Sequence, residues 1–104
     1  MAMLLLSLFA HVADPAAGKA LYAANCTACH GAAGDGKGPA AIALKPRPPD
    51  FMSAAFWAGR TDEQTATSIR AGRPGTTMTP FTQLSTSDVA AVVAYLRTLA
   101  PPAP

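Results

Sequence analysis

The sequence predicts an all-α fold of three to five short helices. Two stretches, Thr61 to Gln64 and Ser85 to Asp88, fit the capping box that opens a helix, in which each end of the box satisfies a backbone N–H group of the other. Apolar residues then recur at helical spacing, most clearly after the second box. The only strand-like piece is residues 89–93, and its cap and period favour a helix.

Composition narrows the class of protein further. Of the 104 residues, 50% are apolar and 13% charged, which fits one compact domain rather than a disordered segment. Aromatic residues make up only 7%, so a cofactor is expected to fill part of the centre of this small domain. The net charge of +2 is too weak for a nucleic-acid protein, which needs a clustered basic face. Most of the scattered basic residues are interpreted as solvated surface charge: Lys45, Arg47, Arg60, Arg70, Arg73 and Arg97.

Residues 1–14 form an apolar, leader-like segment. The apolar run is shorter than the roughly 20 residues that a bilayer span requires, so no transmembrane helix is expected. It is similar to the apolar part of a secretory signal but lacks the usual basic start. We therefore expect the segment either to be cleaved near Ala10 or Ala13, or to be retained and packed on a partner.

The first helix of the domain follows, because Asp14 can cap it and Pro15 suits its first turn. Gly18, Leu21 and Tyr22 share one face of this helix. A glycine inside a helix costs about 1 kcal/mol relative to alanine, so Gly18 is expected to allow close packing. The expected partner is the apolar face of the last helix, formed by Val89, Val92, Val93, Leu96 and Leu99.

The helix leads into Cys26-Thr27-Ala28-Cys29-His30, which has the C-x-x-C-H form of covalent haem attachment. Each thiol can add to one haem vinyl group, and the adjacent imidazole can then bind the iron from one face. The pair has three alternative interpretations: a thioredoxin-like redox couple, half of a zinc site, and a short disulfide. A four-cysteine zinc site is excluded because the chain has only two cysteines, a site with two histidines would need His11, and no strand precedes the motif.

The next segments are irregular. Residues 31–38 hold four glycines and form a loop, whose spacing does not match a phosphate-binding loop. A backbone carbonyl near Pro39 is expected to accept the second ring N–H of His30 and fix its tautomer. After a helical turn at 40–44, the prolines of residues 45–50 predict an extended wall. Phe51, Phe56 and Trp57 are expected around the haem, and Trp57 either binds a haem propionate or packs in the core.

Two helices complete the domain, one at 62–71 that ends at Gly72 and one after Ser85. Met78 lies between them on a loop rich in glycine and proline, an unusual place for a core residue. We therefore expect Met78 to be the second axial ligand of the iron. The alternatives are Met52, His11 or an open position, and His/Met coordination would raise the reduction potential.

Together these patterns resemble the class I c-type cytochromes, and in particular short bacterial members found alone or as domains of larger electron-transfer complexes. The match covers residues 15–100 as one mono-haem domain, with residues 101–104 as a Pro-rich tail. It is carried by Gly18-x-x-Leu21-Tyr22-x-x-x-Cys26-x-x-Cys29-His30-Gly31, Gly38-Pro39, Ile69-x-x-Gly72, Met78-Thr-Pro-Phe81 and Val93-Ala-Tyr95-Leu96.

The resemblance implies a cytochrome c fold around one haem c, held through Cys26 and Cys29 and ligated by His30 and Met78, with the Pro39 carbonyl supporting His30. It implies a one-electron carrier rather than an enzyme, located in the periplasm or otherwise outside the cytoplasmic membrane. Its partners would be redox proteins, either met transiently or in a permanent membrane respiratory or photosynthetic complex. The alternative is a haem enzyme or a gas or redox sensor with an open or labile sixth position.

Overall fold

The computed structural model describes residues 13–102, and within that range the chain is helical without a strand. The elements are α2 (Pro15–Asn25), α3 (Thr27–His30), the 3₁₀ turn η2 (Ala41–Ala43), α4 (Ala54–Trp57), α5 (Asp62–Ala71) and α6 (Thr86–Leu99). The all-α prediction is confirmed. The expectations for residues 1–12, including the leader and His11, and for residues 103–104 lie outside the described range. None of the helices in residues 13–102 is long and apolar enough to cross a membrane.

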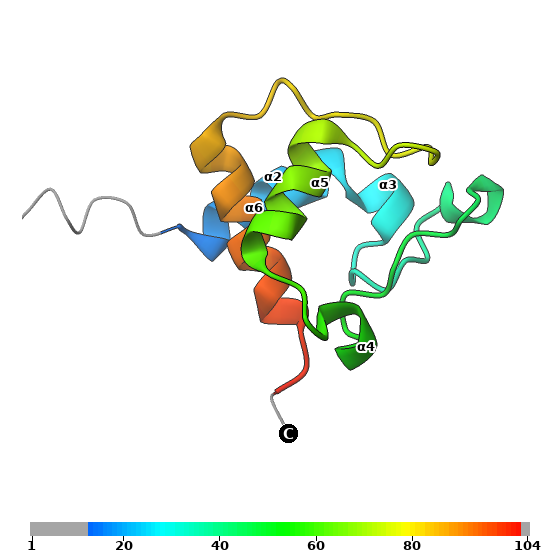
Figure 1. Ribbon diagram of the computed structural model, residues 1–104, viewed down its shortest axis with the longest axis horizontal. Helices are drawn as coiled ribbons and strands as arrows, with labels where there is room; N and C mark the ends of the chain where they lie inside the picture. The colour runs from blue at the N-terminus through cyan, green and yellow to red at the C-terminus, as the bar shows by residue number, and fades with distance from the viewer. Residues whose placement is uncertain (1–12, 103–104) are drawn as a thin grey trace, which may run out of the picture.

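The first and last helices cross and form the centre of the fold. Figure 1 shows α2 in blue behind α6 in orange, and among the elements of residues 13–102 these two helices pack most extensively on each other. Gly18 sits at the crossing, where an added Cβ would collide with the backbone carbonyl of Ala91 and touch the side chain of Tyr95. The rings of Tyr22 and Tyr95 pack nearby, with their centroids 5.3 Å apart. The close-packing role expected for Gly18 is therefore confirmed.

The helix ends follow the sequence signals. The Asp14 side chain accepts the N–H of Ala16 at 2.9 Å, and Pro15 occupies the first turn of α2. Both capping boxes form, at Thr61 with Gln64 and at Ser85 with Asp88. Local chemistry thus fixes where α2, α5 and α6 begin.

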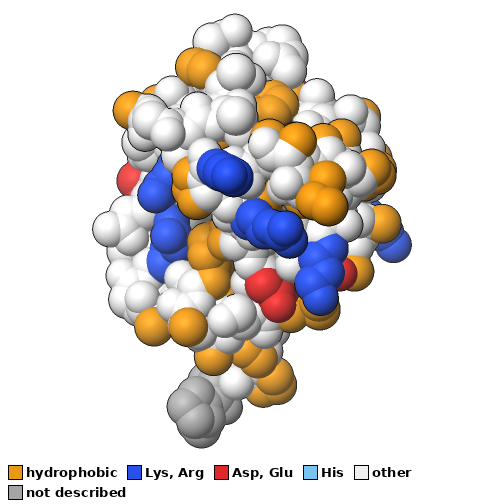
Figure 2. All heavy atoms as spheres, turned by 90° about the vertical axis from the view of Figure 1, so that its right-hand side faces the viewer, with side chains coloured by type: hydrophobic (Ala, Val, Ile, Leu, Met, Phe, Trp, Pro, Cys, Tyr) orange, Lys and Arg blue, Asp and Glu red, His pale blue; other side chains and the backbone are white. Residues whose placement is uncertain are grey.

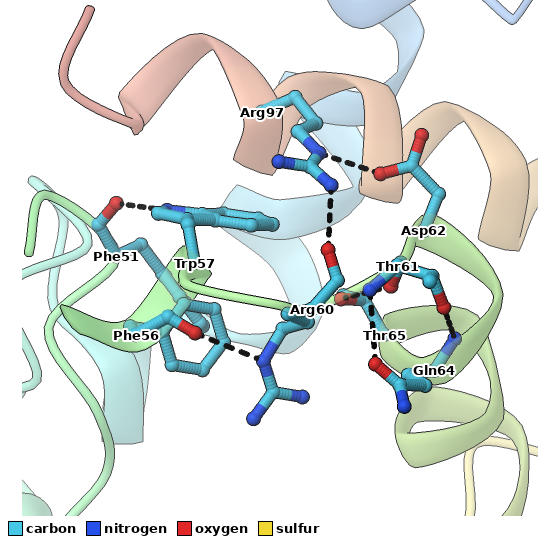
Figure 3. Close-up of polar contacts among 9 residues, drawn as sticks. All are labelled: Phe51, Phe56, Trp57, Arg60, Thr61, Asp62, Gln64, Thr65 and Arg97. Carbon is cyan, nitrogen blue, oxygen red and sulfur yellow. Dashed lines mark hydrogen bonds and ion pairs between the residues drawn. The ribbon is translucent and has the colours of Figure 1, made fainter. Parts of the chain in front are cut away.

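Arg97 of α6 contacts both α4 and the start of α5 (Figure 3). Arg97 pairs through Nε with Oδ1 of Asp62 at 2.6 Å and donates from Nη2 to the carbonyl of Arg60 at 3.0 Å. Its guanidinium also lies 4.4 Å from the ring centre of Trp57. These contacts join α6 to α4 and to the start of α5.

The core is small and lies between α2, α5 and α6. Its large buried side chains are Tyr22, Phe51, Trp57, Ile69, Val89, Val92, Val93 and Leu96. Leu21, expected to be buried, is only half-buried against this cluster. The core does not close on itself, because one side of it faces a cavity.

Candidate cofactor-binding site

Cys26, Cys29 and His30 are brought to one cavity by the junction of α2 and α3. Cys26 ends α2, where its N–H donates to the carbonyl of Tyr22 at 2.8 Å, and the N–H of His30 donates to the carbonyl of Cys26 at 2.9 Å. Residues three and four positions apart on one helical turn lie on the same face. All three side chains accordingly line a cavity of about 390 Å³.

Met78 lines the same cavity from the segment between α5 and α6. That segment folds back on the end of α5. The N–H of Arg73 donates to the carbonyl of Met78 at 3.1 Å. The N–H of Phe81 donates to the carbonyl of Ile69 at 3.0 Å. Gly72 permits the reversal, with φ at 71° and no room for a Cβ beside the Met78 carbonyl. The half-buried Met78 side chain is therefore held at the cavity by its backbone.

Met52, the other methionine within the described residues, is placed differently. It is 45% exposed and is not among the residues that line the cavity. Its N–H is bound by the Asp50 side chain in the turn before α4. The structure thus favours Met78 over Met52 as the thioether available to a cofactor.

The rest of the cavity is mostly apolar. The ring of Phe51 stacks on the His30 imidazole, with centroids 4.9 Å apart and planes inclined by 23°. The wall predicted from the prolines is present, and helices α5 and α6 contribute aliphatic side chains. The lining includes Leu44, Pro46, Pro48, Pro49, Phe51, Phe56, Ile69, Phe81, Leu84, Val92 and Leu96.

The imidazole of His30 has an unsatisfied atom. Its Nδ1 is buried and has no hydrogen-bond partner among the described residues, although buried polar atoms are nearly always paired. Burial lowers the pKa of His30, so the ring is neutral near pH 7 and carries a lone pair. A neutral imidazole facing a cavity is the form that binds a metal ion.

The hydrogen bond expected between the Pro39 carbonyl and His30 is not formed in the structure, because Nδ1 lacks a partner within residues 13–102. Pro39 nevertheless lies beside α3. The N–H groups of its neighbours Gly38 and Ala40 donate to carbonyls of α3 at 3.2 and 2.8 Å. The contact between the Pro39 carbonyl and His30 therefore stays a proposal.

Trp57, for which the sequence left cofactor binding and core packing open, lies away from the cavity. Its indole N–H donates to the carbonyl of Phe51 at 2.7 Å, which uses its one donor. The side chain is 8% exposed, packs edge-on against Phe56, and is not part of the cavity lining. Core packing, the alternative that the sequence left open, is the role that the structure supports.

The two cysteines carry free thiols rather than a disulfide. Burial, and then the neighbouring Cys29, raises the pKa of Cys26 to about 11, so its thiol is protonated at neutral pH. This environment is unlike that of a redox cysteine, whose thiolate is stabilised. Within residues 13–102, no three side chains of His, Cys, Asp or Glu converge as a metal site, so the zinc interpretation gains no support.

These groups fit a haem. A flat apolar body suits the mostly apolar cavity walls, and two thiols, an imidazole and a thioether are among the groups that line the cavity. The volume lies in the usual range for a ligand pocket, about 300–1,000 Å³. Fold and site together define a helical haem-binding domain with covalent attachment.

Comparison with known proteins agrees. Residues 15–100 match the family model of cytochrome c. The chain therefore belongs to the cytochrome c family, and it is an electron-transfer protein with a covalently attached haem c for which Cys26 and Cys29 have the required spacing. A comparison with curated protein sequences finds no match.

Three solved structures are similar in fold and sequence. One is the Kuenenia stuttgartiensis reducing HAO-like protein complex Kustc0457/Kustc0458, with 29% identity over 81% of this chain and a TM-score of 0.71. The second is the KustC0563 c-type cytochrome, with 30% identity over 81% of this chain and a TM-score of 0.65. The third is the dihydro-heme d1 dehydrogenase NirN in complex with DHE, with 34% identity over 84% of this chain and a TM-score of 0.64.

The similar region is a whole protein in one of these structures and a part in the others. It covers 98% of the KustC0563 cytochrome but 41% of the matched chain of the HAO-like complex and 16% of NirN. The same fold thus occurs alone and as a domain of larger proteins.

Sequence reasoning finds the motif residues but misses others around the cavity. Tyr22 and Arg60 line it, as do Arg47 and Arg73. The sequence predicts Tyr22 only as a packing residue, and the arginines only as surface charge. No local pattern signals these roles, because each depends on which segments the fold brings together.

Proposed function

We propose that this protein is a one-electron carrier in which His30 and Met78 bind the haem iron. The observation that carries the proposal is that both side chains line the cavity reached by Cys26 and Cys29. When bound, the haem iron alternates between ferrous and ferric states and so takes up or releases one electron. A thioether ligand favours the ferrous state and raises the reduction potential.

The chain contributes rigidity and exclusion of water. His30 is held by the backbone of α3 and stacked on Phe51, and Met78 is held by two backbone hydrogen bonds near its segment's ends. Ligands fixed in this way keep the same geometry in both oxidation states. The apolar walls exclude water, and two protein ligands leave no coordination position for a substrate. The protein then has no substrate chemistry of its own.

The decisive experiment is the exchange of each methionine for alanine in the haem-loaded protein. Met78→Ala is expected to remove the weak sulfur–iron band of the ferric spectrum and to permit rapid carbon monoxide binding. Met52→Ala is the matched control, since that side chain lies away from the cavity, and should leave both properties unchanged. Rapid carbon monoxide binding by the unmodified protein would instead favour the sensor or enzyme alternative.

We further propose that the carrier delivers electrons to partner proteins outside the cytoplasmic membrane, because covalent haem attachment argues for export. A permanent place in a larger assembly is supported by the HAO-like complex and by NirN, where the similar domain is part of a longer chain. Fractionation of an expressing bacterium checks the location. Sizing of the native protein separates the two modes: a free monomer supports the shuttle, and co-elution with other subunits supports the complex.

A further inference from the structure

Three arginines line the cavity, and among the described residues no acidic side chain joins them. Arg47, Arg60 and Arg73 all contribute to the lining, whereas no Asp or Glu of residues 13–102 does. Arg60 is half-buried and the other two are exposed, so the cavity walls supply no counter-charge and only solvent screens these charges. The interpretation of Arg60 and Arg73 as surface charge is therefore incomplete.

The side chain of Arg60 is fixed in place but has free donors. Its Nε donates to the carbonyl of Phe56 at 3.2 Å, and its guanidinium carbon lies 4.2 Å from the centre of the Phe56 ring. In Figure 3 the guanidinium points away from the Asp62–Arg97 pair, and no dashed line reaches its terminal nitrogens. These two terminal nitrogens are available to a ligand.

Arg73 lies close to Arg60. Burial lowers the pKa of Arg60, and the positive charge of Arg73 lowers it further, so the two guanidinium groups repel each other. Both also line a second hollow of about 650 Å³ next to the cavity. Glu63, which pairs with Arg70, lines that hollow too, as does Ser68, whose hydroxyl is 3.3 Å from Nη1 of Arg73. Arg60 and Arg73 thus lie between the cavity and the second hollow and line both.

Neither arginine is neutralised by the described part of the protein. Within residues 13–102 the side-chain ion pairs are Arg70 with Glu63 and Arg97 with Asp62. Figure 2, which shows the face on the right of Figure 1, has several Lys and Arg side chains in a band, with hydrophobic atoms between them and acidic side chains beside part of the band. A pair of unpaired guanidinium groups at an apolar cavity is the arrangement expected for binding carboxylate or phosphate.

We propose that Arg60 and Arg73 form the binding site for the propionate carboxylates of the haem. The proposal rests on the haem c of the family and goes beyond the proposed iron ligands. A planar carboxylate can accept two parallel hydrogen bonds from the two terminal guanidinium nitrogens of Arg60. Its negative charge also offsets the repulsion between Arg60 and Arg73. Their charges, close to the haem, favour the reduced state and raise the midpoint potential.

The test compares haem-loaded variants by redox titration at neutral pH. Arg60→Gln and Arg73→Gln are each expected to shift the midpoint potential downward, and the double variant to shift it further. Lys19→Gln is the control, because it removes one positive charge from an exposed side chain of α2 that lies outside the cavity lining. Equal shifts in all three single variants would overturn the proposal.

A second readout separates binding from charge alone. Arg60→Lys keeps the charge but loses the fork, so it should retain most of the potential while changing the carboxylate bands of the oxidised-minus-reduced infrared spectrum. Unchanged bands in Arg60→Lys and in both glutamine variants would show that no haem carboxylate contacts the pair. Arg73→Gln, which loses one side-chain hydrogen bond, keeps the proposal testable even if Arg60→Gln does not fold.

A free anion is the rival ligand. Inorganic phosphate, added at constant ionic strength, should leave the potential of the unmodified protein unchanged if the haem carboxylates already occupy the site. A phosphate-induced drop that disappears in the double variant would assign the arginines to an external anion and overturn the proposal. The sulfur–iron band is recorded in the same samples, so a failure of the Met78 assignment is seen separately.

Discussion

At the scale of the residue, the hydroxyl of Tyr22 connects the first helix to the haem-binding turn. It donates to the carbonyl of Gly31 at 2.5 Å, and Gly31 ends α3 directly after His30. Tyr22 is only 2% exposed, so neither partner has ready access to water. This single bond helps to hold the imidazole in place from α2.

Tyr22→Phe is expected to lower the free energy of unfolding by about 0.5–1.5 kcal/mol, because one buried hydrogen bond is lost while the Gly31 carbonyl keeps the N–H of Gly34 at 3.1 Å. Tyr95→Phe, which removes a hydroxyl from the neighbouring half-buried ring, should cost less than about 0.5 kcal/mol. Urea unfolding of the haem-loaded proteins measures both. Similar losses in the two variants would show that the hydrogen bond to Gly31 is not the cause.

The same residue predicts a pH dependence. Burial raises the pKa of Tyr22 above its ordinary value of 10.0. Above that pH the unfolded chain loses the proton while the folded protein keeps it, so stability falls as pH rises, by up to about 1.4 kcal/mol per pH unit. The fall should be shallower in Tyr22→Phe than in the unmodified protein when unfolding is followed from pH 9 upward.

Functional residues that belong to a local sequence motif can be predicted from the sequence. Residues whose role depends on contacts between distant segments cannot. Cys26, Cys29 and His30 follow from local spacing, and Met78 follows from its position on an irregular loop. Trp57 could be assigned either way, since its donor is used by a carbonyl that only the fold brings near. Arg60 and Arg73 are far from the motif, and their shared place at the cavity is a tertiary property.

At the scale of the element, the crossing of α2 and α6 depends on the missing side chain at Gly18. Helix starts are predictable because caps are local chemistry, and the pairing of these two faces is predictable because each is apolar. The chain reversal at Gly72 and the hydrogen bond from Arg73 to Met78 cannot be predicted in this way, because they join irregular segments that have no helical repeat of apolar residues.

Gly18→Ala is expected to destabilise the protein although alanine is the better helix former by about 1 kcal/mol. The new methyl group meets the backbone of Ala91, which cannot move without shifting α6, and such overpacking typically costs about 1–3 kcal/mol or more. Thermal unfolding should therefore show a lower midpoint. Lys19→Ala, on the exposed side of the same helix, is the control and should change little. A Gly18→Ala protein as stable as the parent would contradict close packing at this crossing.

At the scale of the whole molecule, Arg97 links the last helix to α4 and to the start of α5 (Figure 3). The ion pair itself is weak, since its side chains are 39% and 63% exposed and solvent screens the charges. The hydrogen bond to the Arg60 carbonyl and the stacking on Trp57 add to it. Together they hold the segment that carries Phe56 and Arg60 at the cavity.

Arg97→Ala should lower the free energy of unfolding by about 1–2 kcal/mol, the sum expected of one hydrogen bond and one cation–π contact. Arg70→Ala, which breaks only an exposed pair with Glu63, should cost less than about 0.5 kcal/mol. Denaturant titrations of both variants provide the comparison. Equal effects would mean that the Arg97 contacts contribute no more than an ordinary surface pair.

The open side of the core has a consequence for the life of the protein in the cell. Before its porphyrin is attached, the polypeptide has an unfilled cavity beside Phe51, Ile69, Val92 and Leu96 and lacks the packing that the haem supplies there. We expect the haem-free chain to unfold more readily and to be degraded faster than the haem-loaded protein. The steady-state amount of this protein should therefore follow the supply of haem and the capacity of the attachment machinery more closely than the level of its messenger RNA.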